Sequence, residues 1–237
     1  MIPNVKIRPP FFEIGPKSYL VGDQLIALAV AANAASEKYD IDVIFTAPFI
    51  EIRRVAEAAP RLKVFAPHMD PIGIGRGAAS ILPEAVVAAG AYGVMLNHCE
   101  CPLTLSNLAA AIRRADEVGL CTMVCADSIA EAKAVAQLGP NIIVAEPAGL
   151  IGTGVASDIE YVRASIDAVK GINPQILVLQ GAGISGGKDV YNVIHAGAEA
   201  TGSSSGVAAA QNPGAMAEEM IRAVREAYPR SGQQRKP

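Results

Sequence analysis

The chain has 237 residues, a length that suits one domain, and a formal net charge of −3. Its lysines and arginines are scattered, so a nucleic-acid partner is not expected. The longest strongly apolar run, residues 25–32, is too short to cross a bilayer, so a membrane partner is not expected either.

The remaining composition indicates a buried parallel sheet in a reducing compartment. Hydrophobic residues make up 51% of the chain, aromatic residues only 5%, and there is no tryptophan. Small aliphatic side chains therefore fill the interior, as in a sheet that is buried on both faces. Four cysteines do not indicate a disulfide framework, and the first residues lack the pattern of a signal peptide. We expect a cytoplasmic protein.

Short apolar runs alternate with longer alanine-rich amphipathic stretches along the whole chain. The runs predict eight strands, at residues 11–15, 42–47, 62–67, 92–96, 120–124, 141–145, 176–180 and 199–203. The stretches between them predict helices, among them 24–39, 103–118, 128–138, 157–169 and 215–227.

The stretch 128–138 shows the signals of a helix most clearly. Ser128 precedes Glu131 by three residues, which is the capping-box pattern of a helix start. Apolar residues recur at helical spacing, and Glu131 and Lys133 are expected to face water.

Repeated strand–helix units favour parallel strands, and eight such units close naturally into a (β/α)8 barrel. A doubly wound open sheet is the alternative, but no GxGxxG turn follows residues 11–15. We therefore predict a single barrel domain over 1–237, with its core at about 11–226 and a polar tail at 229–237 that frays.

Polar side chains follow many of the predicted strands. In barrels of this kind the active site lies at the carboxyl ends of the strands. The residues found there are Lys17, His68, Asp70, Asn97, His98, Glu100, Asp127 and Glu146. A carboxylate, an imidazole and an ammonium at one mouth suit the removal of a proton next to a carbonyl group.

Glycine-rich turns follow the last two strands, at 181–187 and 202–206, and IGTG follows the sixth strand at 151–154. Such turns let backbone N–H groups approach a phosphate, although glycines also serve tight turns alone. The segment after Glu146 combines Pro147 with several glycines, which suits a lid that closes over a substrate.

Three motifs resemble the triosephosphate isomerase family, especially its short archaeal-type branch. They are NHCE at 97–100, AEPAGLIGTG at 145–154, and GAGISGGKDV at 181–190 followed by SSGVAAAQNP at 204–213. The resemblance runs from about residue 11 to 226. It implies a TIM barrel that interconverts dihydroxyacetone phosphate and glyceraldehyde 3-phosphate through an enediolate, without a cofactor or a metal.

The resemblance also implies roles for single residues. Glu146 would be the base, His98 the neutral electrophile, and Lys17 a substrate clamp paired with Glu100. The backbone amides that would face the phosphate are those of Gly152, Gly183, Ser204 and Ser205.

The sequence departs from the family at the sugar end of the site. The family has an asparagine two residues before its lysine, whereas this chain has Gly15. We expect this change to leave room there and to remove a polar contact. It raises an alternative substrate, a four-carbon ketose phosphate (a tetrulose phosphate). A barrel that binds a phosphate metabolite without catalysis is a further alternative.

Other readings of the same residues are weaker. His98, Cys99 and Cys101 lie too close together in the sequence for the usual zinc arrangements. Lys17 as a Schiff-base lysine is less simple than a charged clamp. The resemblance implies a homodimer or homotetramer, with the loop at 70–80 in the contacts between subunits.

Overall fold

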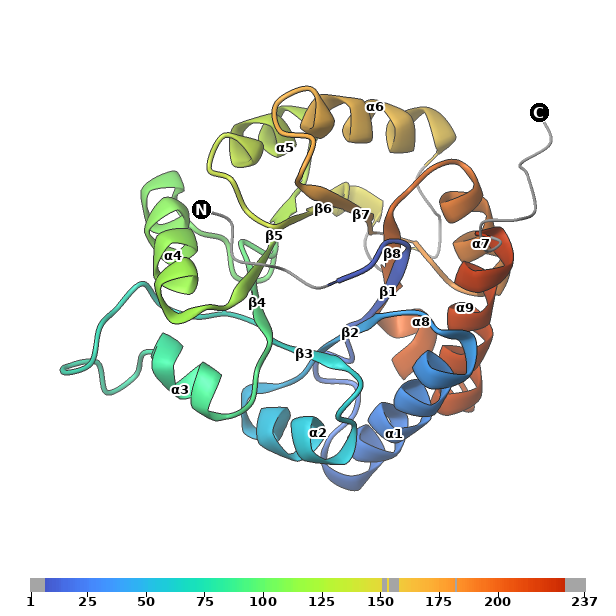
Figure 1. The fold of residues 1–237 in the computed structure, drawn as a ribbon, viewed down its shortest axis with the longest axis horizontal. Helices are drawn as coiled ribbons and strands as arrows, with labels where there is room; N and C mark the ends of the chain where they lie inside the picture. The colour runs from blue at the N-terminus through green and yellow to red at the C-terminus, as the bar shows by residue number, and fades with distance from the viewer. Residues whose placement is uncertain (1–6, 151–152, 154–157, 182, 229–237) are drawn as a thin grey trace.

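Eight parallel strands form a closed barrel in the part of the chain that the structure describes. The structure is a computed structural model that describes residues 7–150, 153, 158–181 and 183–228. The strands follow one another around the barrel in chain order, and the last pairs with the first (Figure 1). They are β1 (Phe11–Ile14), β2 (Val43–Thr46), β3 (Lys63–Ala66), β4 (Gly93–Leu96), β5 (Cys121–Ala126), β6 (Ile142–Ala145), β7 (Leu177–Gln180) and β8 (Ala200–Ser203).

The predicted (β/α)8 barrel is therefore confirmed, with each strand within a residue or two of its predicted bounds. The elements run from Phe11 to Ala227. That the chain from 1 to 237 is one domain stays a prediction, and the tail at 229–237 lies outside the described residues.

Helices surround the barrel and cover its outer face (Figure 1). The α-helices are α1 (Gly22–Tyr39), α2 (Ile52–Ala58), α3 (Pro83–Ala88), α4 (Leu105–Val118), α5 (Ile129–Ala136), α6 (Ile159–Lys170), α7 (Gly187–His195), α8 (Ser205–Ala208) and α9 (Pro213–Ala227). Two short 3-10 helices are η1 (Phe49–Glu51) and η2 (Ala148–Leu150). The five helices predicted by range are α1, α4, α5, α6 and α9.

Apolar side chains fill two layers, one between the barrel and the helices and one inside the barrel. The inner layer includes Phe11, Ile44, Phe65, Met123 and Leu179, all buried. It is tight, because a Cβ on Gly93 would lie 2.5 Å from the ring of Phe65. The predicted aliphatic interior is confirmed only in part, because phenylalanine, methionine and cysteine side chains also fill the inside of the barrel.

Helix α5 begins as predicted, but its Glu131 side chain also bonds to neighbouring loops. The Ser128 hydroxyl accepts a hydrogen bond from the backbone N–H of Glu131, at 3.2 Å. The Glu131 carboxylate accepts hydrogen bonds from the Asn97 side chain at 3.0 Å and from the backbone N–H of Asp127 at 2.8 Å. Glu131 is therefore half-buried, and the prediction that it faces water is met only in part, because the first turn of α5 lies against the loop that follows β4.

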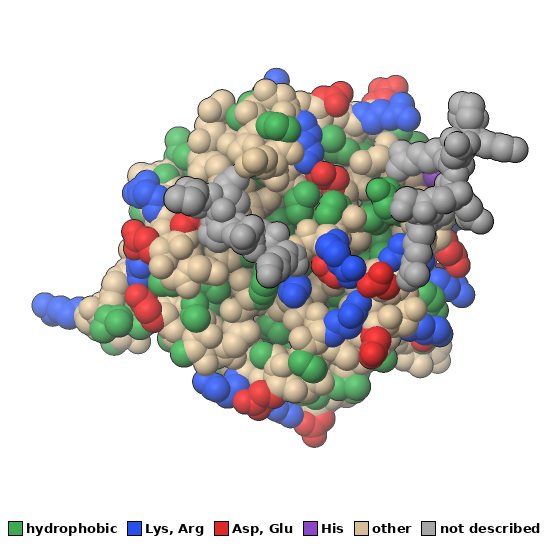
Figure 2. Space-filling model, viewed as in Figure 1, with side chains coloured by type: hydrophobic (Ala, Val, Ile, Leu, Met, Phe, Trp, Pro, Cys, Tyr) green, Lys and Arg blue, Asp and Glu red, His purple; other side chains and the backbone are tan. Residues whose placement is uncertain are grey.

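The surface carries charges of both signs. On the face that Figure 2 shows, lysine and arginine side chains alternate with aspartate and glutamate, and ion pairs join Arg8 to Asp40 and Asp42. Among the described residues, no helix is both long enough and apolar enough to cross a membrane.

Candidate active site

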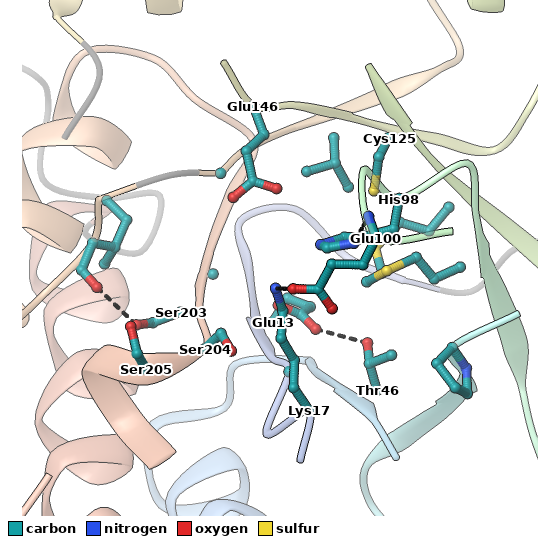
Figure 3. A pocket seen from close by; sticks show the side chains of 18 of the residues that line it. Glu13, Lys17, Thr46, His98, Glu100, Cys125, Glu146, Ser203, Ser204 and Ser205 are labelled. Atoms are coloured by element: carbon teal, nitrogen blue, oxygen red, sulfur yellow. Dashed lines mark hydrogen bonds and ion pairs between the residues drawn. The ribbon is translucent and has the colours of Figure 1, made fainter. Parts of the chain in front are cut away.

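A pocket of about 1030 Å³ opens at the carboxyl ends of the strands, where barrel enzymes place their active sites (Figure 3). Most residues predicted for the site line this pocket: Gly15, Lys17, His98, Glu100, Glu146, Gly183, Ser204 and Ser205. Gly152 lies outside the described residues. Of the other strand-end candidates, His68 lines the pocket, whereas Asp70, Asn97 and Asp127 are not among its lining residues.

Lys17 and Glu100 form an ion pair at the rim of the pocket. The distance from Nζ of Lys17 to Oε1 of Glu100 is 2.8 Å. Burial lowers the pKa of Lys17, but the hydrogen bond and the charge of Glu100 outweigh it, so that the pKa lies above its usual value. The hydrogen bond from Lys17 also lowers the pKa of Glu100. Both side chains are therefore charged at neutral pH.

The backbone of Lys17 is held in an uncommon conformation. Its φ is +46°, in the left-handed region that costs a non-glycine residue roughly 1–2 kcal/mol. The turn is closed by the backbone N–H of Tyr19, which donates to the carbonyl of Pro16 at 3.0 Å. Strain of this kind persists where the surrounding structure fixes a functional side chain, and here it directs Lys17 toward Glu100.

His98 is a neutral imidazole with its proton on Nε2. Its Nδ1 accepts a hydrogen bond from the backbone N–H of Glu100 at 3.1 Å, which assigns the proton to the other ring nitrogen. Burial lowers the pKa of His98, and the positive charge of Lys17 lowers it further, while Glu100 and Asp127 act in the opposite direction. At neutral pH the ring can therefore donate a hydrogen bond into the pocket without carrying a charge.

Asn97 positions the loop that carries His98. Its φ is +57°, a conformation that asparagine adopts more readily than most residues. Its side-chain amide donates to the carbonyl of Cys125 at 3.0 Å and accepts from the backbone N–H of Leu103 at 2.9 Å. Together with the hydrogen bond that the Asn97 amide donates to Glu131, these bonds connect the loop after β4 to the end of β5 and the start of α5. The sequence signal for the positioning role of Asn97 is an asparagine directly before the histidine at the end of a predicted strand. The sequence analysis did not assign this role.

Glu146 extends into the pocket from the end of β6 (Figure 3). Its backbone N–H donates to the carbonyl of Ala126 at 3.1 Å, which continues the β5–β6 pairing up to this residue. Its carboxyl group lies against Gly181, where a Cβ would come within 2.9 Å of the Glu146 Cδ. Glycine at 181 is therefore required for the observed position of the carboxylate.

The opposite side of the pocket is formed by the turns that follow β7 and β8. The Ser203 hydroxyl donates to the carbonyl of Ile184 at 2.7 Å and holds the two turns together. A Cβ on Gly206 would lie 2.5 Å from that same carbonyl oxygen. Within the described residues, the backbone N–H groups of Ser205 and Gly206 have no acceptor, and the buried Ser204 hydroxyl has no partner. Free N–H groups in a turn of this kind suit an anion.

A buried carboxyl group that the sequence analysis did not single out also lines the pocket. Glu13 lies in the middle of β1 and is 8% exposed. Its Oε1 accepts a hydrogen bond from the Thr46 hydroxyl at 2.7 Å. Burial raises the pKa of Glu13 to about 7; the charge of Glu146 adds to this, whereas the Thr46 bond and Lys17 oppose it.

Glu13 also corrects the expectation for Gly15. A Cβ on Gly15 would lie 3.0 Å from Oε1 of Glu13, so the space next to Gly15 is already taken by a carboxyl group. The absence of a side chain at position 15 therefore neither leaves room there nor removes polarity from the pocket. The main observation behind a larger, four-carbon substrate is lost.

The cysteines beside His98 are exposed, free thiols. Cys99 lies 3.8 Å from Nδ1 of His98, measured from Sγ, and Cys101 lines the pocket. In the described part of the chain, no three His, Cys, Asp or Glu side chains are grouped so that they could hold a metal ion.

These features define the chain as a β/α-barrel enzyme with a carboxylate, a neutral imidazole and an ammonium group around one pocket. A sequence profile of the family described as "Triosephosphate isomerase" matches residues 17–221. The chain is 35% identical to the triosephosphate isomerase of Methanosarcina barkeri, over 91% of this chain and 99% of the relative. It is 36% identical to that of Methanocaldococcus jannaschii, over 86% and 94%.

The fold is also that of a solved structure, the triosephosphate isomerase of Bartonella henselae. The TM-score is 0.74 at 14% identity, and the match covers 94% of this chain and 99% of the other. The protein belongs to the triosephosphate isomerase family.

Proposed function

We propose that this protein is an isomerase that interconverts dihydroxyacetone phosphate and glyceraldehyde 3-phosphate. The observation that carries the proposal is the arrangement of three side chains in one pocket. Glu146, the neutral His98 and the charged Lys17 line it together. On its other side lie the N–H groups of Ser205 and Gly206, which have no acceptor among the described residues. The family membership of the chain supports the same activity.

Glu146 is the group that moves the proton in this proposal. Its carboxylate removes a proton from the carbon next to the substrate carbonyl. The electron pair of the C–H bond forms the double bond of an enediolate, and the carbonyl oxygen takes the negative charge. The hydroxyl proton of the first carbon passes to the oxygen of the former carbonyl group, beside the Nε2–H group of His98. The protonated Glu146 returns its proton to the carbon of that former carbonyl group, and the electron pair left on the hydroxyl oxygen forms the new C=O bond of the aldose.

His98 and Lys17 stabilise the enediolate. The Nε2–H group of His98 donates a hydrogen bond to its oxygens, and Lys17 offsets their negative charge. Because the site is partly buried, these interactions are stronger than in water. The pairing with Glu100 keeps Lys17 charged and in place.

The phosphate group of the substrate binds at the turns after β7 and β8. The backbone N–H groups of Gly183, Ser204 and Ser205, with Gly206 beside them, supply hydrogen-bond donors without a full positive charge. Gly152, which lies outside the described residues, is proposed as a further backbone donor to the phosphate. No cofactor and no metal enter the proposed reaction.

The assembly and location of the protein belong to the same proposal. The segment between β3 and α3 projects from the barrel (Figure 1), and its Ile74 is 82% exposed. An apolar side chain at the tip of a loop suits a contact with a second copy of the chain, in a homodimer or homotetramer. The four free cysteines suit the reducing cytoplasm.

A coupled assay of the purified protein with both triose phosphates tests the function. We expect rapid turnover, and incorporation of deuterium from D2O at the carbon that exchanges its proton. Glu146→Gln should lower kcat by about 1,000-fold, because it removes the base. Glu160→Gln, a change on the exposed side of α6, is the matched control and should leave kcat unchanged.

Two results would contradict the proposal. One is negligible turnover of triose phosphates beside rapid turnover of a tetrulose phosphate offered in the same assay. The other is full activity of Glu146→Gln, which would show that another group removes the proton. A protein that binds inorganic phosphate but turns over neither sugar would be the non-catalytic barrel.

A further inference from the structure

Resting on the proposed function, we propose that Glu13 is a substrate-binding residue whose carboxyl group hydrogen-bonds an oxygen atom at the sugar end of the substrate. The carboxyl group lies in the pocket, near the side chains assigned to catalysis (Figure 3). Glu13 would thereby contribute to specificity, because its carboxyl group offers a ligand with hydroxyl groups a polar contact at the barrel wall.

The position of Glu13 is set by the barrel itself. In the register of β1, Glu13 pairs with Ile44 of β2 and with Gly202 of β8. Its side chain shares the inner face of the barrel with Phe11, which lies in the apolar inner layer. Glu13 is thus the polar continuation of that layer, at the level where the barrel opens into the pocket.

Two glycines give the Glu13 carboxyl group its space. A Cβ on Gly15 would lie 3.0 Å from Oε1, and a Cβ on Gly202 would lie 2.7 Å from Oε2. Neither glycine has a φ in the left-handed region, so the backbone conformation does not require glycine at either position. The atoms nearest to a Cβ on Gly15 would all belong to the Glu13 carboxyl group, whereas a Cβ on Gly202 would also lie 2.9 Å from the Cβ and from the carbonyl oxygen of Glu13. Gly15 is therefore fitted to the carboxyl group, and Gly202 to the whole of residue 13.

The hydrogen bond to Thr46 uses only part of the capacity of the carboxyl group. The Thr46 hydroxyl donates to Oε1, and among the described residues no donor reaches Oε2. A buried carboxyl group that serves structure alone is costly unless its oxygens are satisfied within the protein. Because Glu13 lines the pocket, a bound ligand can provide the missing partner.

The charges around Glu13 favour its protonated form when an anionic ligand is bound. The titratable groups that face it are Lys17 after β1, Glu146 after β6 and Cys125 on β5. Its pKa is raised to about 7, first by burial and then by the negative charge of Glu146. A phosphorylated ligand adds further negative charge nearby. Protonated Glu13 donates a hydrogen bond to a hydroxyl or carbonyl oxygen, and this bond is lost as the pH rises above about 7.

Two probes separate a contact to the sugar end from an effect on the whole pocket. Glycerol 3-phosphate has the phosphate and the hydroxyl groups but cannot isomerise, whereas inorganic phosphate lacks the sugar end. Their dissociation constants are measured by calorimetry for the wild-type protein, Glu13→Gln and Glu13→Ala, at pH 6.5 and 8.5. Because both probes carry phosphate, the ratio of the two constants removes most of the effect of phosphate ionisation.

We expect Glu13→Ala to weaken glycerol 3-phosphate about 10- to 100-fold, the effect of a lost hydrogen bond in a buried site. Binding of inorganic phosphate should change less than about twofold. Glu13→Gln, whose amide also donates, should bind like the wild-type protein at pH 6.5. At pH 8.5 the wild-type protein should bind glycerol 3-phosphate about tenfold more weakly relative to phosphate, and Glu13→Gln should not.

Removing the bond from Thr46 gives an independent test. Because this bond lowers the pKa of Glu13, Thr46→Val should move the alkaline loss of glycerol 3-phosphate binding to higher pH. If Glu13 had only a structural role, Thr46→Val would not change the pH at which glycerol 3-phosphate binding is lost. The inference is overturned if both Glu13 variants bind glycerol 3-phosphate as the wild-type protein does, or if Glu13→Ala loses both probes equally.

These binding measurements test Glu13 separately from the proposed triose phosphate isomerisation. A wild-type protein that fails to isomerise triose phosphates contradicts the proposed function, whereas the two binding ratios still decide on Glu13. If Glu13→Ala does not fold, the pH profiles of the wild-type protein and of the isosteric Glu13→Gln decide instead. Equal profiles would overturn the inference.

Discussion

The backbone N–H of Glu100 donates a hydrogen bond to Nδ1 of His98, at 3.1 Å. Glu100 therefore acts on two catalytic groups. Its backbone N–H sets the tautomer of His98, and its carboxylate holds the ammonium group of Lys17. The four-residue motif NHCE thus contains both the electrophile, His98, and the residue that pairs with Lys17, Glu100. The spacing between His98 and Glu100 is what allows both contacts.

The neutral state of His98 has a measurable pH dependence. Its pKa is lowered by burial and by Lys17, so the ring takes up a proton at a lower pH than an ordinary histidine, whose pKa is 6.5. As the pH falls, the unfolded chain binds this proton first, so the contribution of His98 to stability is present above pH 6.5 and is lost below it. NMR of the protein with 15N-labelled histidine, assigned with His98→Gln, should show a neutral Nε2–H ring at pH 7. A charged ring at that pH would contradict the assignment.

Glu100→Gln should separate activity from stability. The Glu100 side chain is 64% exposed, and ion pairs in such places contribute at most about 1 kcal/mol to folding. Thermal unfolding should therefore change little. Activity should fall about tenfold and decline further at high pH, because the pKa of Lys17 loses the support of the carboxylate and its side chain loses its anchor. An unchanged kcat/KM over the whole pH range would show that the ion pair has no part in catalysis.

Gly181→Ala should displace the proposed base without removing it. The new Cβ would lie 2.9 Å from Cδ of Glu146, a distance that real Cβ atoms do not tolerate. A shift of about 1 Å in a reacting group costs about 100-fold in rate, so kcat should fall by that factor while KM changes little. Glu160→Gln, on the exposed side of α6 and not among the residues that line the pocket, is the control and should leave kcat unchanged. Normal kcat in Gly181→Ala would place the reacting carboxylate elsewhere.

Gly206→Ala should weaken phosphate binding. A Cβ at this position would lie 2.5 Å from both the carbonyl oxygen of Ile184 and the hydroxyl oxygen of Ser203. The turns after β7 and β8 would have to separate, and the N–H groups proposed to hold the phosphate would no longer converge. We expect KM and the inhibition constant of inorganic phosphate to rise together by about tenfold. A change in kcat alone would contradict this assignment.

The barrel could be predicted from the sequence because its strands are short apolar runs between long amphipathic stretches. The range of helix α2 was not predicted, since seven residues show too little of the helical period. The residues at strand ends could be found by position alone, and their motifs indicated roles. The hydrogen bond by which Asn97 and Glu131 fix the loop after β4 could not be predicted from the sequence, because the two residues are 34 positions apart.

Glu13 could not be found in the sequence for a related reason. A single carboxylate in the run FFEIG gives no sign of which face it occupies. In a strand, neighbouring side chains point to opposite faces, and only the pairing of β1 with β2 and β8 decides which of them point inward. The glycines at 15 and 202 are explained only once that pairing is known, because one follows the end of β1, two residues after Glu13, and the other lies directly opposite Glu13 on β8.

The buried carboxyl group of Glu13 should also make the stability of the protein depend on pH. Its pKa is about 7 in the folded chain and 4.5 as an ordinary glutamate. Between these values the native state retains a proton that the unfolded chain has released, so a rise in pH favours unfolding. The favourable contribution is complete below pH 4.5 and is lost as the pH passes about 7.

Glu13→Gln should remove this dependence. The separation of about 2.5 pH units corresponds to about 3 kcal/mol, by which the wild-type protein should lose stability between pH 4.5 and pH 8 relative to Glu13→Gln. Urea unfolding of both proteins at several pH values measures the difference, and titrating groups that do not interact with Glu13 cancel in the comparison. The difference must grow with pH, because the amide cannot ionise. A difference that stays constant from pH 4.5 to pH 8 would mean that Glu13 is charged in the folded protein, and its oxygens could then only accept hydrogen bonds.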